Sequence, residues 1–273
     1  MQARDIRRHA EPARGILRRG VADGPGEHLR LLPPAALEPY VHHFWWVRWR
    51  LAAPVVAEGL PHPSVHVVFE EHDGACRAEI AGPHTGRFVK QLSGTGCAFG
   101  IKFRAGGFAP LLGRPMTQLT NRVVPLADVF GAPSDAWARA TFAEPELDGR
   151  MALATAFLAP LLPPLPAEVV RVRDLVERMA ADRTLVRVDD VSLATGIDLR
   201  TLQRSFRRFV GLSPKQVLQR FRLLEAVEQL KAEAPPSLAE LALSLGYADQ
   251  PHFARDFKRI IGRTPKSFAT RTP

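Results

Sequence analysis

The feature that most constrains the fold of this chain is an internal repeat near its C-terminus. The stretch VDDVSLATGIDLRTLQRSFRRFVGLSP, residues 188–214, returns as LAELALSLGYADQPHFARDFKRIIGRTP, residues 238–265. The equivalent pairs include Gly196 and Gly246, Asp198 and Asp249, Phe206 and Phe257, Gly211 and Gly262, and Pro214 and Pro265. Because single positions correspond, the repeat predicts one supersecondary unit that is used twice.

Each copy has the pattern of two short helices joined by a tight turn. The first apolar segment ends at a glycine, Gly196 or Gly246, which readily adopts the positive φ of a helix C-cap. An aspartate, Asp198 or Asp249, then occupies the N-cap position of a second helix of about three turns. The apolar stripe of the second helix consists of Leu199, Leu202, Phe206 and Phe209, or of Phe253, Phe257 and Ile260 or Ile261. This pattern predicts two helix-turn-helix motifs.

The face opposite each apolar stripe carries cationic and amide side chains. Arginine can donate two hydrogen bonds to guanine, and glutamine can pair with an adenine edge, so base contacts are expected in the N-terminal half of the second helix. Further lysines and arginines neutralise phosphates. A solvated basic face would explain one copy, but two copies in register favour DNA binding.

The segment between the copies predicts one long helix. PKQVLQRFRLLEAVEQLKA, residues 214–232, opens with a proline at the first helical position and keeps an apolar periodicity. Such a helix spans on the order of 28 Å, which suits two recognition helices about one DNA turn, ~34 Å, apart. For Arg220 and Arg222 on this helix, a salt bridge at the edge of the core and a phosphate contact are both open.

These stretches together resemble the DNA-binding domain of the AraC/XylS family of bacterial transcriptional regulators. The resemblance covers residues 168–270 and implies seven helices with two helix-turn-helix motifs, 188–211 and 238–262; we assign residues 168–273 to this domain. On matching positions it implies base contacts by Arg200, Gln203, Arg204, Gln250, His252 and Arg255. We expect phosphate contacts from Thr201, Arg207, Arg208, Lys258 and Arg259. Pro251 departs from the expected pattern, because it removes a backbone donor from the first turn.

The charge of the chain is concentrated in the same region. The 273 residues carry a net charge of +9. From Arg171 to the end there are 19 lysines and arginines and 12 aspartates and glutamates, so seven of the nine net positive charges lie there. This placement favours nucleic acid as the partner.

Other sequence features predict the cellular compartment of the protein. The basic N-terminus is not followed by a signal-peptide core, and no apolar run reaches the ~18 residues of a membrane span. Cys76 and Cys97 give neither a disulfide framework nor zinc spacing, which indicates a reduced cytoplasm. We expect both cysteines as small buried residues on strands, with a thiol sensor or a repair protein's acceptor cysteine as the alternatives.

The N-terminal half predicts a β-rich domain, so the chain is expected to be an α+β protein of two domains. Residues 1–27 are rich in Arg, Gly and Pro and predict a mobile arm, which Ile16 and Leu17 could anchor to the following sheet. Residues 28–161 predict a sandwich or barrel with flanking helices. The expected strands are 42–49, 64–70, 76–82, 86–92 and 96–104, and the expected helices are 108–113, 134–142 and 146–162. Residues 162–167 form the expected proline-rich linker.

This half also resembles the cupin-like N-terminal sensor domain of one group of AraC-type regulators. The resemblance rests on PYVHHFWWVRW, LPHPSVHVVFE and GCAFGIKFRAGGFAPLLG. It implies a sensing or dimerising domain. Trp45 and Trp49 share a strand face, and an aromatic interior suits an apolar or ring-bearing effector. Trp45, Trp49 and His66 are therefore the candidate effector residues, with ordinary core as the alternative.

A metal-dependent cupin-type enzyme fused to a DNA-binding module is the alternative function. One strand face is expected to hold His62, Ser64, His66, Val68 and Glu70, and two imidazoles with a carboxylate could bind a divalent metal. Along a strand, however, His62 and His66 would lie about 13 Å apart, too far for one ion without a bend at Pro63. We expect neither a metal nor another cofactor, and no catalytic residues.

The sequence thus predicts an effector-responsive regulator that binds double-stranded promoter DNA and is not an enzyme. A second copy of the chain is a candidate partner. RNA polymerase would be a partner if the protein activates transcription. No membrane partner is expected.

Overall fold

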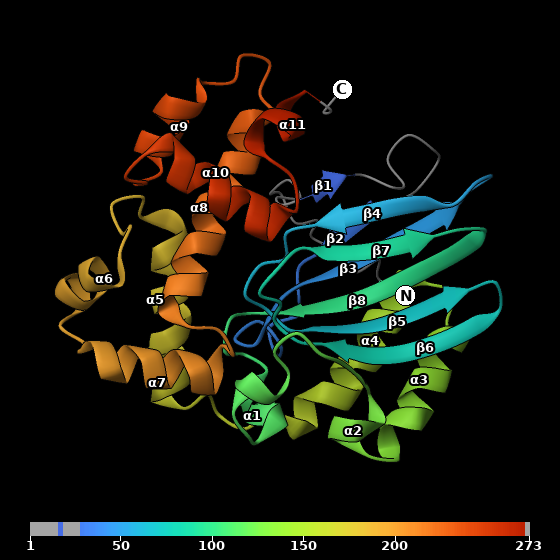
Figure 1. The fold of residues 1–273 in the computed structure, drawn as a ribbon. Coiled ribbons are helices and arrows are strands. Elements are labelled where there is room, and N and C mark those ends of the chain that lie inside the picture. Colours follow the sequence, from blue (N-terminus) through green and yellow to red (C-terminus); the bar gives the residue numbers. More distant parts are fainter. Residues whose placement is uncertain (1–15, 19–27, 271–273) are drawn as a thin grey trace.

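The computed structural model describes residues 16–18 and 28–270 (Figure 1). The N-terminal half holds two antiparallel sheets, of order β2-β3-β8-β5-β6-β9 and β1-β4-β7. The strands are β1 (Ile16–Arg18), β2 (His28–Leu31), β3 (Val41–Arg50), β4 (Val55–Gly59), β5 (His66–His72), β6 (Ala75–Ala81), β7 (Phe88–Leu92), β8 (Thr95–Phe103) and β9 (Val123–Pro125). All five strands predicted from the sequence are present, with ends shifted by one or two residues.

The two sheets pack face to face, so of the two predicted alternatives, a sandwich and a barrel, the structure has the sandwich. Trp49 and Ala98 of the larger sheet share a buried cluster with Leu92 of the smaller sheet. Successive side chains of a strand point to opposite faces, so Trp45 and Trp49 face the smaller sheet while Phe44 and Trp46 join the core on the other side. The prediction that Trp45 and Trp49 share a strand face is confirmed.

Two glycines of β8 make room for these indoles. Trp45 pairs with Gly100 and Trp49 with Gly96 across the β3–β8 ladder. A Cβ atom at Gly100 would lie 2.0 Å from the Trp45 ring, and one at Gly96 would lie 2.3 Å from the Trp49 ring. Each indole therefore lies directly over the neighbouring strand, which fixes its position inside the sandwich.

Short helices cover the outer face of the larger sheet, as Figure 1 shows. They are α1 (Ala109–Leu112), α2 (Ala127–Phe130), α3 (Pro133–Ala143) and α4 (Leu147–Leu158), with the 3-10 turns η1 (Met116–Gln118) and η2 (Ala159–Leu161). Trp137 of α3 lies between the sheet and α4: its ring centroid is 4.9 Å from that of Phe69 and 4.3 Å from that of Phe157. These contacts pack α3 and α4 against the sheet.

The C-terminal half is all-α, as predicted. The described residues form α5 (Ala167–Ala181), α6 (Val188–Thr195), α7 (Leu199–Phe209), α8 (Pro214–Leu230), α9 (Leu238–Ser244), α10 (Gln250–Ile261) and α11 (Pro265–Ala269). The first motif is α6–α7 and the second is α9–α10, with α8 between them. At 1.5 Å per residue α8 spans roughly 26 Å. Nowhere in the described residues does a helix have both the length and the apolar character of a membrane span.

Several elements of the N-terminal half were not predicted. β2, β4, β9 and α2 have three to five residues each, too few for a readable periodicity. The larger sheet organises β9 and α2, because β9 pairs with β6 and the Leu126 amide donates to the Ala78 carbonyl at 3.0 Å. β5 begins only at His66, so the expectation that His62 and Ser64 share its face is wrong: a turn in which the Ser64 amide donates to the His62 carbonyl precedes the strand.

The structure describes only part of the predicted N-terminal arm, and it describes the predicted linker in full. Within residues 1–27 only Ile16–Arg18 are described, and they form β1 against β4 instead of a mobile segment; the rest of the predicted arm lies outside the described residues. The expected link to the sheet is the pairing of β1 with β4, whereas the buried Leu17 side chain belongs to the cluster that contains the second motif. Residues 162–166 have no regular secondary structure before α5 begins, and the Tyr40 hydroxyl donates to the Pro163 carbonyl.

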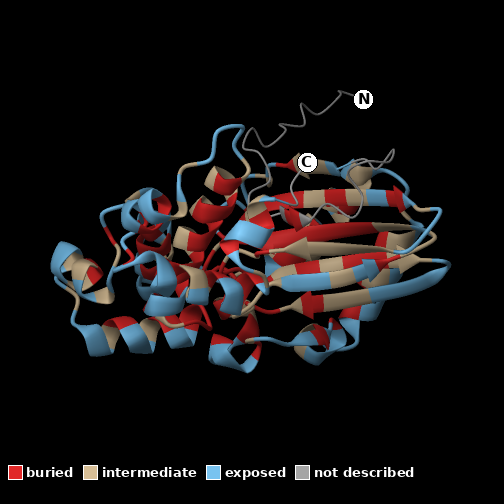
Figure 2. Ribbon diagram, turned by 45° about the horizontal axis from the view of Figure 1, so that its top comes forward, coloured by how far each residue is buried: buried red, intermediate tan, exposed pale blue. Residues whose placement is uncertain are grey.

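The hydrophobic core does not stop at the boundary between the halves. One buried cluster contains Phe103 and Phe108 of the sandwich half together with Val169 of α5 and Phe206 of α7. A second cluster joins the second motif to Leu17 and Leu60. Figure 2 shows the buried residues continuing from the sheets into the helices. Each motif therefore shares its core with part of the N-terminal half.

Candidate DNA-binding surface

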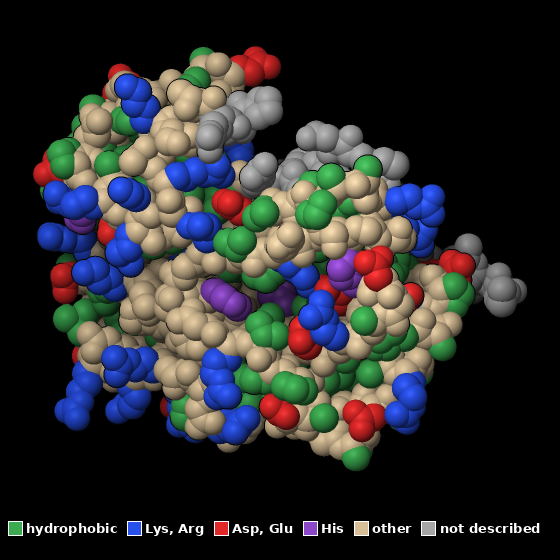
Figure 3. All heavy atoms as spheres, turned by 45° about the vertical axis from the view of Figure 1, so that its right-hand side comes forward, with side chains coloured by type: hydrophobic (Ala, Val, Ile, Leu, Met, Phe, Trp, Pro, Cys, Tyr) green, Lys and Arg blue, Asp and Glu red, His purple; other side chains and the backbone are tan. Residues whose placement is uncertain are grey.

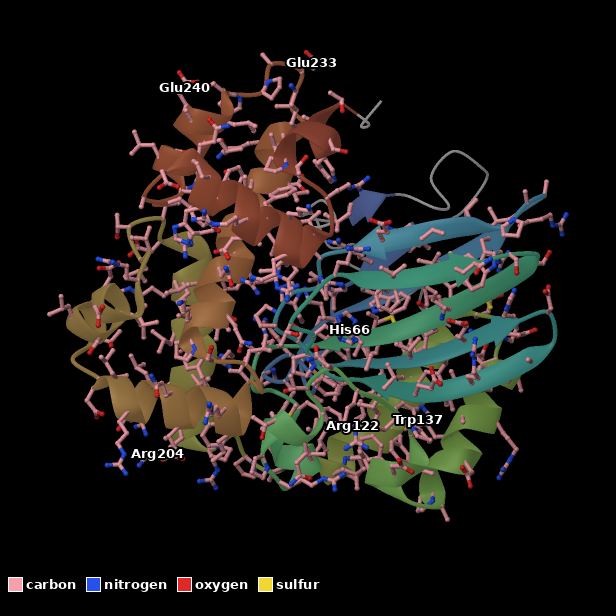
Figure 4. The ribbon with its side chains drawn as sticks, viewed as in Figure 1. His66, Arg122, Trp137, Arg204, Glu233 and Glu240 are labelled. Atoms are coloured by element: carbon pink, nitrogen blue, oxygen red, sulfur yellow. The ribbon has the colours of Figure 1, made fainter. Side chains whose placement is uncertain are left out.

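Helix α7 presents the predicted contact residues of the first motif to solvent. Its N-cap is Asp198, whose Oδ1 accepts a hydrogen bond from the Thr201 amide at 2.9 Å. Leu202 and Phe206 are buried, so the opposite face points outward. The exposed side chains on that face are Arg200, Gln203, Arg204, Arg207 and Arg208, while Thr201 is half-buried. Arg204 projects away from the rest of the molecule (Figure 4).

Helix α10 repeats this arrangement. Asp249 caps it through a 2.6 Å hydrogen bond from the His252 amide, and Phe253 and Phe257 are fully buried. Pro251 lies in the first turn, where a helix needs no amide donor from it. The exposed side chains are Gln250, His252, Arg255, Lys258 and Arg259. The structure thus places all the predicted base-contact side chains on two exposed, equivalent faces.

Arg259 takes part in a network that the sequence did not reveal. Its Nη2 donates to Gln219 Oε1 at 3.0 Å and lies 3.1 Å from Asp256 Oδ1. Gln219, buried on α8, also donates to Asp256, and His252 Nε2 lies 3.8 Å from the same carboxylate. The sequence signal for this network was Asp256, an acidic residue on an otherwise cationic helix. The network ties α10 to α8 and orients Arg259.

Replacing Asp198 is expected to change how the stability of the first motif depends on pH. Hydrogen bonds from Thr201, the backbone amide first, lower the pKa of the Asp198 carboxyl. A carboxyl with a lowered folded-state pKa stabilises the fold above its unfolded-state pKa, and this contribution is lost as pH falls through the folded-state value. Asp198→Asn should keep the cap but flatten the acidic limb of melting temperature against pH. An unchanged acidic limb would contradict this assignment.

The two arginines of α8 are structural rather than DNA-facing. Arg220 is 2% exposed, and its guanidinium donates to the carbonyl oxygens of His84 and Gly86 at 2.6 and 3.0 Å. Burial lowers its pKa to about 10, so it stays protonated at neutral pH. Arg222 lies 4.7 Å over the Tyr247 ring, and burial raises the pKa of that phenol to about 12. Arg220 is too deeply buried to reach a phosphate, and among the described contacts neither arginine forms a salt bridge.

The sandwich interior brings two of the three candidate effector residues together. Trp45 Nε1 donates to His66 Nδ1 at 3.2 Å, with the ring centroids 6.2 Å apart. Figure 4 shows His66 among the strands, close to the helical half. Trp49 lies further along β3, where its Nε1 donates to the Ser93 carbonyl and its ring faces His72. Trp49 therefore belongs to a different part of the interior.

Further cationic and imidazole groups surround the Trp45–His66 pair. Lys102 of β8 is 8% exposed and pairs with His66 in the ladder. Burial, followed by the charge of Lys102, lowers the pKa of His66 to about 3 and also lowers the pKa values of His43 and His62. These imidazoles are neutral at neutral pH. Sequence reasoning missed Lys102, although its spacing of two from Gly100 on a predicted strand was the signal.

The remaining candidates for chemistry are the predicted metal-binding set and the two cysteines. Among the described residues, no three His, Cys, Asp or Glu side chains are placed to hold a metal ion. Glu70 of the predicted set pairs instead with Arg77 and Lys90. Cys97 is half-buried, but the expectation of a buried Cys76 is wrong, because it lies exposed beside the hairpin turn at Asp73 and Gly74. Burial raises the pKa of the Cys97 thiol. Partial desolvation and the nearby charge of Glu71 raise that of the exposed Cys76 thiol, so neither is an activated thiolate.

Two family profiles match this chain. One, described as a helix-turn-helix domain, matches residues 191–271, which contain both motifs. The other, described as a domain of unknown function, DUF6597, matches residues 29–125, which form most of the sandwich. Each profile thus falls within one half of the chain.

Two curated transcription factors are similar to part of this chain. The transcriptional activator RhaS of Pectobacterium carotovorum is 35% identical over 71 residues, which are 26% of this chain and 25% of RhaS, so the match spans about a quarter of that relative. The probable transcription factor PqrA of Proteus vulgaris is 32% identical over 83 residues, 30% of this chain and 67% of PqrA.

Part of this chain is also similar to a solved structure. It is a probable AraC family transcriptional regulator from Rhodopseudomonas palustris, 30% identical, with 37% of this chain and 95% of that chain covered and a TM-score of 0.34. The identity to PqrA covers two thirds of that protein, and the helix-turn-helix profile matches the region that holds both motifs. The chain therefore belongs to the AraC/XylS family of transcriptional regulators.

Proposed function

We propose that this protein is a sequence-specific transcription regulator that binds promoter DNA through α7 and α10. The observation that carries the proposal is the pair of equivalent recognition helices, each with a buried aromatic face and an exposed face of arginine, glutamine or histidine. Lysine and arginine side chains gather over the helical half in Figure 3. Two such faces on one chain fit two successive half-sites of a duplex.

The position of each side chain along its helix supports a division of roles. Arg200, Gln203 and Arg204 lie in the first half of α7, and Gln250, His252 and Arg255 lie in the first half of α10. We assign these residues to base edges in the major groove. The exposed cations at the C-terminal ends, Arg207, Arg208, Lys258 and Arg259, and the half-buried Thr201 are assigned to phosphates.

Genome-wide binding of the purified full-length chain to fragmented DNA of its host tests this function. We expect a small number of sites that share two short half-motifs about one helical turn apart. A chain that lacks residues 168–273 is the control and should recover none of these sites. Only diffuse, salt-sensitive binding by the full-length chain would contradict sequence-specific regulation.

Removing a phosphate contact is expected to weaken binding equally on all sequences. Lys258→Ala should lower the slope of log affinity against log salt concentration by about one, because one fewer counterion is released. Titrations of a fluorescent duplex at several salt concentrations measure this slope. Arg139→Ala, an exposed arginine of α3 on the sandwich half, is the matched control and should leave the slope unchanged. An unchanged slope for Lys258→Ala would remove Lys258 from the phosphate-binding set.

We further propose that the sandwich half senses an effector in its interior near Trp45 and His66. The hydrogen-bonded indole and imidazole offer an aromatic face beside polar nitrogen atoms, which suits a ring-bearing ligand. We leave Trp49 out of this site because it lies further along β3, where its ring faces His72 and its indole nitrogen donates to the Ser93 carbonyl. A screen of ring-bearing compounds by tryptophan fluorescence, with His66→Ala as the comparison, tests the site. Ligand responses that are identical in both proteins would contradict it.

The other expectations remain predictions. Among the described residues, no specific observation favours the alternative function, a metal-dependent cupin-type enzyme. RNA polymerase as a partner in activation, a second copy of the chain, and a cytoplasmic location all follow from the family resemblance and the sequence features above.

A further inference from the structure

One loop of the sandwich touches both DNA-binding motifs and the helix that joins them. This β6–β7 loop, residues 82–87, connects a strand of the larger sheet to a strand of the smaller sheet. It lies beside the C-terminal end of α7, the middle of α8 and the C-terminal end of α10. The following contacts establish its position.

The contacts with the two motifs fall on equivalent positions of the repeat. At Gly211, which follows α7, an added Cβ atom would lie 2.9 Å from Pro83 Cγ. At Gly262, which follows α10, an added Cβ atom would lie 1.4 Å from Arg87 Nη1, and the same nitrogen donates to the Ile261 carbonyl at 3.0 Å. Both glycines have positive φ, 84° and 85°. The loop therefore packs against the same turn of each recognition helix.

The contact with α8 is the most buried of the three. Arg220 donates from its two terminal nitrogens to the carbonyl oxygens of His84 and Gly86. A planar guanidinium that spans two carbonyl groups fixes both the distance and the orientation of the loop against α8. Removing it would leave two loop carbonyls without their donor in a buried place.

The loop is itself held in a defined shape. The Thr85 amide donates to Asn121 Oδ1 at 2.7 Å, and the Asn121 amide donates to the Pro83 carbonyl at 2.9 Å. Thr120, next to Asn121, donates from its hydroxyl to the Gly211 carbonyl at 2.6 Å. On the other side Glu58 of β4 lies 4.0 Å from Arg87 and 3.7 Å from Arg263. A shift of the sandwich layers would therefore move the loop as a unit.

We propose that the β6–β7 loop sets the relative position of the two recognition helices, with Arg220 and Arg87 as positioning residues that contact no DNA. This inference rests on the proposed DNA-binding function. The loop leaves the exposed faces of α7 and α10 free and holds only their C-terminal ends. Its consequence is a fixed spacing between the two half-sites that one chain can bind. A change in the sandwich would then alter which spacing is bound, without altering either half-site.

A spacing series with the full-length chain tests the proposal. Half-motifs selected from random DNA by the wild-type chain are placed on duplexes at centre-to-centre spacings from about 8 to 13 base pairs, around one turn. The wild type should bind one spacing best. Arg87→Ala, which frees only the second motif, should keep its affinity for each single half-motif. For this variant, the ratio of the affinity at the best-bound spacing to that at the worst-bound spacing should fall about fivefold or more. Fivefold is the lower end of the usual coupling between two sites.

Two further variants separate positioning from folding. Arg122→Ala, an exposed arginine of the sandwich half whose guanidinium donates only to the nearby Gln118 carbonyl among the described contacts, is the matched control and should keep the wild-type ratio. Arg220→Lys keeps the charge but cannot span both carbonyls, so it should lower the ratio as Arg87→Ala does. Uniform weakening on all spacings, or an unchanged ratio in both variants, overturns the proposal. A wild-type chain that selects no half-motif at all overturns the DNA-binding function itself.

Discussion

Replacing Phe206 by alanine is expected to lower the free energy of unfolding by about 3–5 kcal/mol, as for other fully buried phenylalanines. The side chain of Phe206 has no exposed surface and belongs to the cluster that also contains Phe103 and Phe108 of the sandwich half. Truncation would leave a cavity in a core that the two halves share. The loss should therefore appear in both halves and not in the first motif alone.

The tryptophans allow this consequence to be measured. All four, Trp45, Trp46, Trp49 and Trp137, lie in the N-terminal half, so tryptophan fluorescence during urea unfolding reports on the sandwich and its helices. Phe206→Ala should lower the midpoint of this transition although the substitution lies in α7. Leu193→Ala is the matched control: Leu193 is 85% exposed on α6, so its change should stay within about 0.5 kcal/mol. A fluorescence midpoint unaffected by Phe206→Ala would contradict a shared core.

Replacing Arg204 by alanine is expected to weaken binding to the cognate site by about 1–3 kcal/mol, roughly 5- to 150-fold, and to relax base preference at one position. Arg204 is exposed in the first half of α7, where a guanidinium can present two donors to a guanine edge. The measurement is affinity for the cognate duplex and for duplexes changed at each single position.

Arg207→Ala provides the matched comparison for Arg204. Arg207 lies three residues further along α7 and is also exposed. Its removal should weaken binding by the same factor on every duplex, because a phosphate contact carries no base information. If Arg204→Ala also weakens all duplexes equally, Arg204 belongs with the phosphate contacts and the assignment of base reading to this residue is wrong.

Much of the DNA-binding half could be predicted because its signals are local. Asp198 and Asp249 cap helices through bonds to amides three residues away. Ser213 caps α8 in the same way, by accepting a hydrogen bond from the Gln216 amide, and Pro214 occupies the first helical position. The exposed faces of α7 and α10 followed from the spacing of Phe206 and its equivalents, because a helix places residues three and four apart on one side. Because the motif occurs twice, each cap and buried position could be predicted independently from both copies.

The sandwich was predicted in outline only. Strands rich in aromatic and β-branched residues were found, but β9 and α2 were missed because pairing with β6 and the bond to Ala78 organise them. His62 was placed on a strand, whereas a turn at Pro63 ends the extended segment before β5. Lys102 was overlooked because its spacing of two from Gly100 shows only that the two residues share a face of the strand, and not that this face lies inside the sandwich.

By itself, the sequence determined the two motifs, their caps, their exposed cationic faces and the long helix between them. These features depend on contacts within a few residues and on periodicity, which a single segment displays. Only the tertiary structure decided what Arg220 does, where Leu17 packs and which loop contacts both motifs. The Arg220 and Arg87 bonds connect residues 134 and 174 positions apart. Such pairs leave no local pattern in the sequence, because only the packing of the two halves brings their atoms within hydrogen-bond distance.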